Sequence, residues 1–480
     1  MKLNKRILGR EEECRRLERC IKEGTAQLVI VYGRRRVGKT FLINQFFNNE
    51  FYFKLTGIHG ENRNTQLKNF IVSLKRYSQK QYPTPKDWFQ AFEYLREYIG
   101  QISGNRKVVL FFDEMPWLDT HNSSFLPAFE LFWNDYASTM DNIVIILCGS
   151  ATAWMDKKIV QNKGGLFHRQ TCKLYLEPFK LNTVEEYLKR RNIYWSRYDI
   201  AECYMVMGGI PYYLSLLDSE LTVKQNIDSL FFKKKGELWD EFDHLYKTLF
   251  TNSEKYEKVV AALSEKRGGL TRDEIIEKTG LSSGGDLSKI LDNLALSGFV
   301  RVNGFYGNKK KEALYQLADY YTLFYFRYIK NNYGKDENYW CNSIDNPARR
   351  TWSGLAFEQI CKDHVSQIKH KLGISGVLSN EYSWSTEKDE EKAVSGAQID
   401  LLIDRRDNVI SVCEEKYSVN KFGIDKYYNE DLRNKIDSFI KVTDCPKSIQ
   451  LVMITTYGLK NSKYNSIVTK QVLLDDLFNK

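Results

Sequence analysis

A loop near the N-terminus combines two glycines, a lysine and a hydroxyl in an order that binds phosphate. Residues 33–40, GRRRVGKT, fit the pattern G-x-x-x-x-G-K-[ST]. The glycines let backbone N–H groups converge on phosphate oxygens, and a helix that begins at Lys39 adds the positive end of its dipole. Lys39 is expected to reach the β- and γ-phosphates, and the Thr40 hydroxyl to bind Mg²⁺. The expected chemistry is binding and hydrolysis of a nucleoside triphosphate.

The whole loop and its C-terminal flank are expected to surround the nucleotide. Its three arginines keep the loop electropositive, with side chains that face the nucleotide, solvent or a partner. The predicted nucleotide-binding residues are Gly33, Arg34, Arg35, Arg36, Val37, Gly38, Lys39, Thr40 and Phe41.

Polar residues for the same chemistry follow two further apolar runs. Residues 108–112 predict a buried strand, and Asp113 and Glu114 come directly after it. Asp113 is expected to hold the Mg²⁺, and Glu114 to polarise the attacking water. A third buried strand is predicted over residues 143–148, and Ser150 beyond it is expected either to sense the γ-phosphate or to belong to a simple turn.

A parallel sheet is the element that would position these groups, because they all follow strands. The strand before the phosphate loop is predicted over residues 28–32, and a helix follows the loop. The sequence therefore predicts an α/β fold, with a P-loop NTPase core over residues 1–180.

Several short motifs resemble those of AAA-type ATPases of the archaeal type, with a signalling-type (STAND-like) layout. The motifs are Gly9-Arg10-Glu11, VYGRRRVGKT, LFFDE, CGS, LEPF and GGIPYYL, spread over residues 1–230. The resemblance implies that the nucleotide is ATP, with Gly9 and Arg10 near the adenine and Pro211 packed near the base. Arg169 is a candidate for stabilising transition-state charge, with a solvated arginine as the alternative, and the family often has LFGR where this chain has LFHR.

The middle of the chain predicts three further parts. Residues 181–250 have the amphipathic pattern of a helical lid, and residues 251–320 that of a winged helix-turn-helix. The three lysines 309–311 at the tip of the wing would meet DNA phosphates, with a protein contact or a rigid spacer as the alternative role. Residues 321–350 predict an aromatic helical linker, whose rings pack in a core rather than stack on bases.

A second set of charged residues lies in the last third of the chain. Residues 399–403 and 409–413 predict a hairpin, with Asp400 on its first strand and Glu414 and Lys416 at the end of its second. Alternation along a strand puts Glu414 and Lys416 on one face. Asp400 and Glu414 are then candidates for holding a divalent metal, and Lys416 for orienting a water or neutralising the phosphorus centre.

This constellation resembles the restriction-endonuclease-like superfamily, whose motif is D followed by (D/E)-x-K, with a helical glutamate upstream. The domain is assigned to residues 351–480. The resemblance implies a catalytic set of Glu358, Asp400, Glu414 and Lys416 and a second Mg²⁺ or Mn²⁺. The alternative is a degenerate domain that binds without cleaving.

The bulk properties indicate a multidomain globular protein. Its 480 residues predict two to four domains, and its apolar runs are too short to span a bilayer. A charged start without a signal-peptide core predicts a cytoplasmic location, where the nine scattered cysteines stay reduced. The net charge of +10 suits DNA but also fits an ordinary surface.

Two functions follow from these observations. The first is an ATP-hydrolysing AAA-type ATPase that couples its nucleotide state to a DNA-binding or metal-dependent nuclease-like C-terminal domain. The second is a nucleotide-dependent protein-interaction switch with an inactive C-terminal domain. Adenine nucleotide and DNA are the expected partners, and a second copy of the chain or another protein is a further one.

Overall fold

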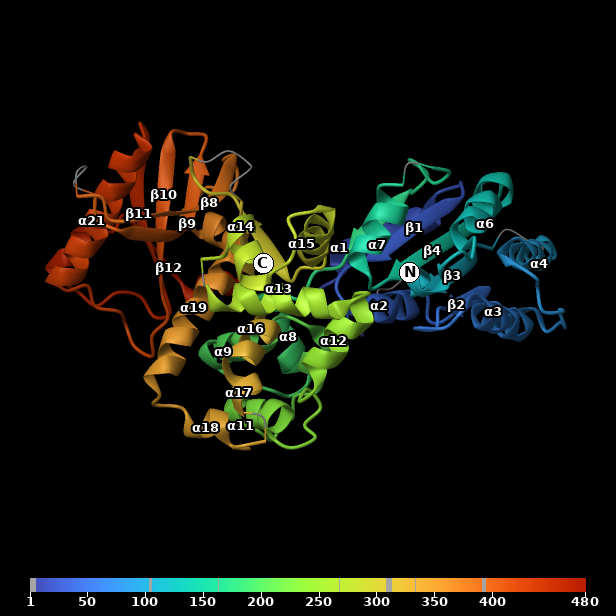
Figure 1. The fold of residues 1–480 in the computed structure, drawn as a ribbon, viewed down its shortest axis with the longest axis horizontal. Coiled ribbons are helices and arrows are strands. Elements are labelled where there is room, and N and C mark those ends of the chain that lie inside the picture. Colours follow the sequence, from blue (N-terminus) through green and yellow to red (C-terminus); the bar gives the residue numbers. More distant parts are fainter. Residues whose placement is uncertain are drawn as a thin grey trace. The chain divides into compact units, whose positions relative to one another are not determined.

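The chain forms two compact units in the computed structural model, which describes residues 6–102, 106–162, 164–266, 268–307, 313–332, 334–390 and 394–480 (Figure 1). The first unit comprises Met1–Pro178 and Thr248–Thr251, and the second comprises Phe179–Lys247 and Asn252–Lys480. Each unit contains a five-stranded sheet with helices around it, so the predicted α/β class is confirmed. Across the described ranges, no helix has the length and apolarity needed to cross a membrane.

The sheet of the first unit is parallel, with the strand order β2-β3-β4-β1-β5. Its strands are β1 (Gln27–Tyr32), β2 (Phe53–Thr56), β3 (Val108–Asp113), β4 (Ile143–Gly149) and β5 (Cys172–Tyr175). Every residue of β3 and β4 is buried, as expected for central strands covered on both faces. Because the strands are parallel, the carboxyl ends of β1, β3 and β4 meet at one edge of the sheet.

Helices cover this sheet through a core that is rich in aromatic rings. They are α1 (Glu11–Lys22), α2 (Lys39–Phe46), α3 (Arg63–Ser78), α4 (Trp88–Gly100), α5 (Met115–Leu118), α6 (Phe125–Leu131) and α7 (Thr152–Trp154). Phe92 of α4 contacts Phe112 of β3 and Phe129 of α6, with ring centroids 6.1 and 5.9 Å apart. This packing fixes the strand that carries Asp113 at its end.

Short helices open the second unit: α8 (Leu181–Arg190), α9 (Arg197–Met207), α10 (Pro211–Ser215), α11 (Val223–Ile227) and α12 (Glu241–Leu249). The turn between α9 and α10 requires glycine, because a Cβ on Gly209 would lie 1.8 Å from the Phe179 carbonyl oxygen.

The aromatic segment predicted over residues 321–350 packs as core, as predicted. Trp340 and Trp352 meet edge to face at 5.5 Å, and both are buried.

Three helices and a hairpin come next. They are α13 (Ser253–Glu265), α14 (Arg272–Thr279), α15 (Gly285–Leu296), β6 (Val300–Asn303) and β7 (Leu314–Leu317). Thr271 and Glu274 form a capping box at the start of α14, in which each side chain accepts from the backbone N–H of the other. β6 and β7 are antiparallel, and Leu270 pairs with Tyr315. The predicted lysines at the tip, residues 309–311, lie outside the described residues.

The sheet of the second unit is mixed, with the strand order β12-β11-β10-β9-β8. Its elements are α19 (Pro347–Asp363), α20 (Val365–Leu372), β8 (Ser379–Thr386), β9 (Ala397–Arg405), β10 (Val409–Lys416), α21 (Lys426–Thr443), β11 (Ser448–Thr455) and β12 (Lys470–Leu473). β9 and β10 pair antiparallel, so the predicted hairpin is present. β10, β11 and β12 run parallel to one another.

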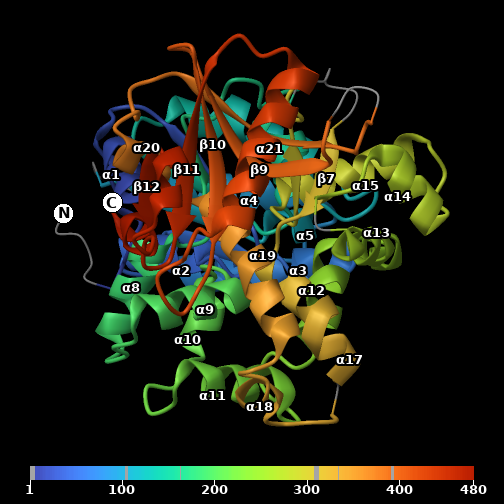
Figure 2. The ribbon, with the colours of Figure 1, turned by 90° about the vertical axis from the view of Figure 1, so that its left-hand side faces the viewer.

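Different helices cover the two faces of this sheet. Leu432 and Phe439 of α21 belong to one core cluster with Val412 of β10, and Figure 2 shows α21 lying along the strands. On the opposite face, Phe357 of α19 contacts Tyr417, just beyond β10, at 5.4 Å. Strand alternation therefore turns the side chain of Glu414 toward α21 and that of Glu415 toward α19.

Candidate functional site

The phosphate loop connects β1 to α2 in a conformation that only glycine permits at both ends. Gly33 has a φ of 137°, and a Cβ there would lie 2.4 Å from the Leu176 carbonyl oxygen. Gly38 has a φ of 89° and precedes the first residue of α2. The predicted strand, loop and helix are therefore all present.

Lys39 lies inside this loop rather than in solvent. The residue is 5% exposed, and its Nζ donates to the carbonyl oxygens of Gly33 and Arg34, each at 2.9 Å. Burial lowers the pKa of the ammonium, while Cys148, Glu114 and Asp113 act in the opposite direction. The charge of Lys39 is thus held at the loop, where a phosphate oxygen can replace the carbonyls as acceptor.

Thr40 and Asp113 come together as the sequence predicts. The Thr40 hydroxyl donates to the Asp113 carboxylate, with its oxygen 2.9 Å from Oδ2 and 3.1 Å from Oδ1. Burial raises the pKa of Asp113, and so does the charge of Glu114, whereas the Thr40 hydrogen bond lowers it. A hydroxyl and a carboxylate are hard oxygen donors of the kind Mg²⁺ takes, so these two residues fit that ion.

Glu114 and Ser150 also meet, in a contact that the sequence did not indicate. Glu114 has a φ of 47°, in the left-handed region, just after β3. Its Oε2 accepts from the Ser150 backbone N–H at 3.0 Å and from the Ser150 hydroxyl at 2.8 Å. Ser150 therefore fixes the direction of the Glu114 carboxylate at the edge where β3 and β4 end.

Arg10, the residue before α1, contacts the backbone of the phosphate loop. The buried Arg10 guanidinium donates to the carbonyl oxygens of Val37, at 3.2 Å, and Glu177, at 2.7 Å. Burial lowers the pKa of Arg10, and Glu13 counteracts this effect. Gly9 before it has a φ of 62°. The predicted place of Gly9 and Arg10 near the adenine stays a prediction.

The remaining predicted nucleotide residues differ in exposure and location. Arg34 and Val37 are buried, Arg35 and Arg36 are half-buried, and the Phe41 side chain is 51% exposed.

Arg169 and Pro211 are the two remaining residues predicted for the nucleotide site. Arg169 is exposed in a turn, where its backbone N–H donates to the Leu166 carbonyl at 3.1 Å. Pro211 lies in the second unit, as the first residue of α10. Their proposed roles stay predictions.

In the second unit, Glu414 is surrounded by donors from its own strand and from α21. Its carboxylate accepts from Tyr428 Oη at 2.7 Å, from Lys435 Nζ at 2.6 Å and from Lys416 Nζ at 2.9 Å. Burial alone would raise the pKa of Glu414, but the charges of Lys416 and Lys435 hold it at about 2. The predicted meeting of Glu414 and Lys416 is confirmed, but within a closed ion-pair cluster.

Asp400 has different surroundings from Glu414, and the predicted metal pair of these two residues stays a prediction. Asp400 lines a cavity beside α19 together with Lys362, and its Oδ1 accepts from Gln398 Nε2 at 2.8 Å. Within the described ranges, no group of three or more His, Cys, Asp or Glu residues is placed to hold a metal ion.

The pairing of β8 with β9 is irregular beside Asp400. The register shifts between Tyr382 and Trp384. Ile399 and Leu402, an odd number of positions apart, both pack in the core cluster on the α21 face. Strict alternation is therefore broken between them, and Asp400 falls on the α19 face.

Glu415 is the carboxylate that shares this face with Asp400. It is 7% exposed, and its Oε1 has no hydrogen-bond partner among the described residues. Burial raises the pKa of Glu415 to about 8, and the charges of Asp400 and Glu414 contribute to the rise. Glu358 lies on α19 one helical turn before Lys362, on the same side of the helix.

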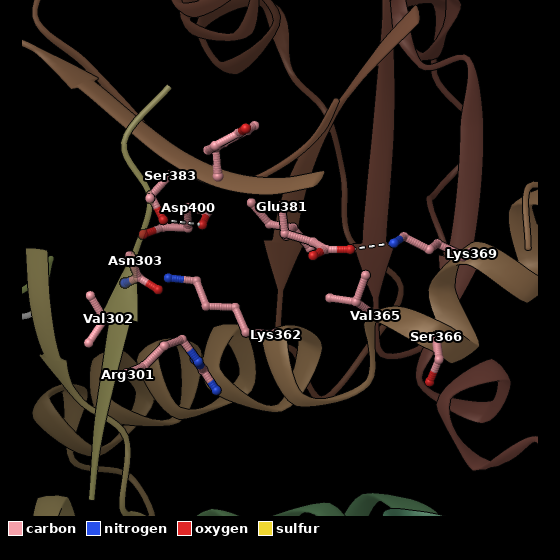
Figure 3. Close-up of a pocket in the computed structure, with 13 residues that line it drawn as sticks. Arg301, Val302, Asn303, Lys362, Val365, Ser366, Lys369, Glu381, Ser383 and Asp400 are labelled. Atoms are coloured by element: carbon pink, nitrogen blue, oxygen red, sulfur yellow. Dashed lines mark hydrogen bonds and ion pairs between the residues drawn. The ribbon is translucent and has the colours of Figure 1, made fainter. Parts of the chain in front are cut away.

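Two adjoining cavities, of about 440 and 600 Å³, share Lys362, Ser383 and Asp400. Figure 3 shows the smaller one, with the Lys362 side chain reaching from α19 toward Asn303 and Asp400. Four cationic side chains line the cavities, Arg301, Lys362 and Lys369 in the first and Lys266 in the second, against the carboxylates Glu381 and Asp400. The sequence missed this grouping because its members come from separate elements and look like surface charges.

Comparison with known proteins gives a match for the first part of the chain. Residues 7–217 match the family model described as an ATPase domain predominantly from Archaea. Over 369 residues the chain is 28% identical to an uncharacterized protein, MJECL04, of Methanocaldococcus jannaschii, covering 75% of this chain and 78% of that one. Over 44 residues it is 54% identical to the uncharacterized ATP-binding protein MJ0423 of the same organism. This match covers 9% of this chain and 75% of that one.

Two solved structures are similar at lower identity. The Walker-type ATPase PABY2304 of Pyrococcus abyssi is 19% identical, with a TM-score of 0.48, covering 67% of this chain and 96% of that one. The ORC2 protein of Aeropyrum pernix, in ADPNP–ADP complexes, is 14% identical, with a TM-score of 0.42. The match covers 69% of this chain and 95% of that one.

Proposed function

We propose that the chain hydrolyses ATP and couples its nucleotide state to DNA through its C-terminal region. The match of residues 7–217 to the model of an ATPase domain predominantly from Archaea supports the first half of this proposal. The observation that carries the ATPase half is the contact of Thr40 with Asp113, 2.9 Å apart, at the mouth of a loop that holds Lys39.

Each of these residues has a distinct part in phosphoryl transfer to water. Thr40 and Asp113 would hold the Mg²⁺ that neutralises charge on the phosphoryl oxygens. Lys39 would exchange its two carbonyl acceptors for β- and γ-phosphate oxygens, while the loop N–H groups bind the remaining oxygens. Glu114 orients the attacking water and accepts its proton, and Ser150 keeps that carboxylate aimed.

Other parts of the nucleotide site complete the proposal. Arg10 ties the loop to the segment after β5 and, with Gly9, would border the adenine. Pro211 would pack near the base, and Arg169 would stabilise transition-state charge. The core over residues 1–180 and the lid over residues 181–250 form the proposed ATPase module.

The DNA-binding half of the proposal rests on the elements that follow. Three helices and a hairpin, from α13 to β7, have the order of a winged helix, proposed for residues 251–320, with residues 321–350 as a packed aromatic connection. Two cavities, lined by residues of both the proposed winged helix and the proposed nuclease-like domain, residues 351–480, are walled by lysine and arginine. A net charge of +10 agrees with a polyanionic partner.

A second candidate function is a nucleotide-dependent switch whose C-terminal domain binds without cleaving. The observation in its favour is that Glu414 is fully engaged with Lys416, Lys435 and Tyr428. In this case ATP would change protein contacts, and DNA would leave the rate of ATP hydrolysis unchanged.

The experiment that tests the ATPase half measures phosphate release by Lys39→Ala beside Lys68→Ala, an exposed lysine on α3. We expect turnover to vanish in the first variant and to persist in the second. Undiminished turnover in Lys39→Ala would overturn the assignment of the loop. A rise in turnover with added duplex DNA favours coupling, whereas an unchanged rate favours the switch.

A further inference from the structure

We propose that the two adjoining cavities of the second unit bind one nucleoside phosphate, with the phosphate group in the smaller cavity and the base in the larger one. All lining residues that the structure describes belong to the second unit, so the site is separate from the phosphate loop. Binding there requires neither ATP hydrolysis nor cleavage of DNA, so it goes beyond the proposed function. The ligand chemistry is shared by a free nucleotide and by the phosphorylated end of a nucleic-acid strand.

The smaller cavity, of about 440 Å³, receives cationic side chains from three elements. Arg301 comes from β6, Lys362 from α19 and Lys369 from α20. Lys362 donates to a neutral amide, Gln316 Oε1, at 3.3 Å, and Figure 3 shows its side chain extending toward Asn303. Lysine binds phosphate as a point charge. Lys362 is therefore placed to hold a phosphate oxygen in this cavity.

The other two cations have acidic partners of different kinds. Arg301 pairs with Asp363, which ties β6 to α19. Lys369 pairs with Glu381, whose side chain is 44% exposed. Exposed ion pairs contribute little to stability, and a phosphate monoester carries close to two negative charges at pH 7. A phosphate beside Lys362 can therefore take Lys369 from Glu381.

The larger cavity, of about 600 Å³, has a lining that suits a flat base. It includes the aromatic rings of Phe305 and Trp384 and the backbone of Gly268. Trp384 is only 2% exposed, whereas Phe305 is half-buried. Bases stack on aromatic side chains with little dependence on sequence. Phe305 is thus the ring placed to stack on a base.

Three residues, Lys362, Ser383 and Asp400, line both cavities and mark their junction. Backbone pairing between Phe305 and Ser383 holds the junction together. The Ser383 N–H donates to the Gly304 carbonyl at 3.3 Å, and its hydroxyl donates to the Asp400 carbonyl at 2.9 Å. A carboxylate such as that of Asp400 is a suitable acceptor for sugar hydroxyls. The order phosphate, sugar and base thus corresponds to Lys362, Asp400 and Phe305.

The full chain with Lys39→Ala isolates this site, because the variant lacks the lysine of the phosphate loop. Isothermal titration calorimetry on it uses AMP, GMP, CMP and UMP in turn. We expect at least one of them to bind. Lys362→Met should weaken that binding by roughly 10- to 100-fold, the effect of losing a hydrogen bond to a charged group. Lys369→Met should weaken it as well.

Lys371→Met is the matched control, because it removes another lysine from α20. Lys371 pairs with Asp476 at 3.0 Å and is not among the residues that line the cavities. Its substitution should leave the affinity for the nucleotide nearly unchanged.

Phe305→Leu tests the place of the base. It should weaken binding of the nucleoside monophosphate by about fivefold or more, because a stacking contact is lost. Ribose 5-phosphate has no base, so its binding should not change. Equal effects on the two ligands would contradict the assignment of Phe305 to the base.

An oligonucleotide with a terminal phosphate and its counterpart with a terminal hydroxyl distinguish the two ligand sources. A preference for the phosphate form that depends on Lys362, without binding of free nucleotides, assigns the site to a strand end. The proposal is overturned if Lys362→Met weakens no ligand more than Lys371→Met does. It is also overturned if both oligonucleotides bind equally and free nucleotides do not bind, since a contact with the DNA backbone explains that result. Failure of DNA to stimulate ATP hydrolysis contradicts the proposed function alone.

Discussion

Ser150 donates two hydrogen bonds to a single oxygen of Glu114, from its backbone N–H at 3.0 Å and from its hydroxyl at 2.8 Å. The carboxylate proposed to activate water is thus aimed by the end of a neighbouring strand. The backbone of Glu114 stays in the left-handed region, where non-glycine residues are uncommon. This arrangement links three strands of one sheet, β1 through its loop, β3 and β4, to one reaction.

Ser150→Ala should slow ATP hydrolysis while it leaves ATP affinity nearly unchanged. The variant keeps the backbone donor but loses the hydroxyl, and a hydrogen bond to a charged group contributes about 1.5–3 kcal/mol. We therefore expect kcat to fall by roughly 10- to 100-fold. Steady-state kinetics check the split between kcat and KM, with Ser150→Thr as the variant that retains a hydroxyl. A kcat equal to that of the native chain would show that Ser150 does not position Glu114.

Gly33→Ala should remove nucleotide binding and lower thermal stability. Its new Cβ would lie 2.4 Å from a backbone oxygen of Leu176, in a backbone conformation with a φ of 137°. Neither the loop nor the segment after β5 can move without opening the cradle. Gly24→Ala is the matched control, because a Cβ there meets nothing within 4 Å. Binding of a fluorescent ATP analogue and a melting curve test this, and equal affinity in the two variants would contradict it.

His364 should make the second unit less stable in mild acid. The ring is buried, its Nδ1 donates to the Ile360 carbonyl at 2.8 Å, and its Nε2 accepts from the Leu181 N–H at 3.1 Å, so both nitrogens are satisfied in the neutral form. Burial lowers the pKa of His364 from 6.5 to about 4, and the charge of Lys180 adds to this effect.

The sign of this effect follows from the lowered pKa. Above pH 6.5 both states are neutral and the full stability is present, and it is lost as the pH falls toward 4, because the unfolded ring binds a proton first. The largest loss in the free energy of unfolding that this pKa change can cause is about 3 kcal/mol. Urea unfolding measures the free energy of unfolding at pH 7.5 and at pH 5. This free energy should change less between the two pH values in His364→Gln than in the native chain. The substitution His370→Gln, at an exposed position, should leave the native change unaltered.

The buried pair of Arg349 and Glu202 should be more costly to break than to replace. The Arg349 guanidinium pairs with Glu202, donates to the Trp340 carbonyl at 2.5 Å and lies 3.9 Å from the Trp340 ring centre. Arg349→Ala leaves the buried Glu202 carboxylate with the Trp340 indole N–H, at 2.9 Å, and the Lys224 ammonium, at 3.5 Å, so we expect a loss at the lower end of about 3–5 kcal/mol in the free energy of unfolding. The double variant Arg349→Met/Glu202→Gln should recover part of this loss. Denaturant unfolding midpoints of the single and double variants test this prediction. If the loss in the double variant equals the sum of the losses in the two single variants, the prediction is wrong.

The nucleotide site was predictable from the sequence because its parts are local. Two glycines, a lysine and a threonine within eight residues fix a loop, and Asp113 marks the end of an apolar strand. Parallel strands bring such ends together without further information. The bond between Ser150 and Glu114 was not predictable, because it depends on the conformation of each residue after its strand.

The surroundings of the C-terminal carboxylates were only partly predictable. Alternation along β10 correctly put Glu414 and Lys416 on one face, but the sequence has no local signal for the register shift opposite Asp400. That shift arises from pairing between strands, and it decides which carboxylate Asp400 accompanies. Lys362 and Arg301 belong to a helix and a strand far apart in the chain, so their shared cavity follows only from the tertiary fold.

The doubled glutamate at positions 414 and 415 also gives the domain an unusual freedom to change. Neighbouring residues of a strand point in opposite directions, so removing one residue from the turn between β9 and β10 would turn every β10 side chain to the other face of the sheet. Such a deletion would turn Glu414 away from Lys435 of α21 and bring Glu415 to that side. A lineage could in this way lose a codon and still keep a carboxylate beside α21, without inventing a new acidic side chain.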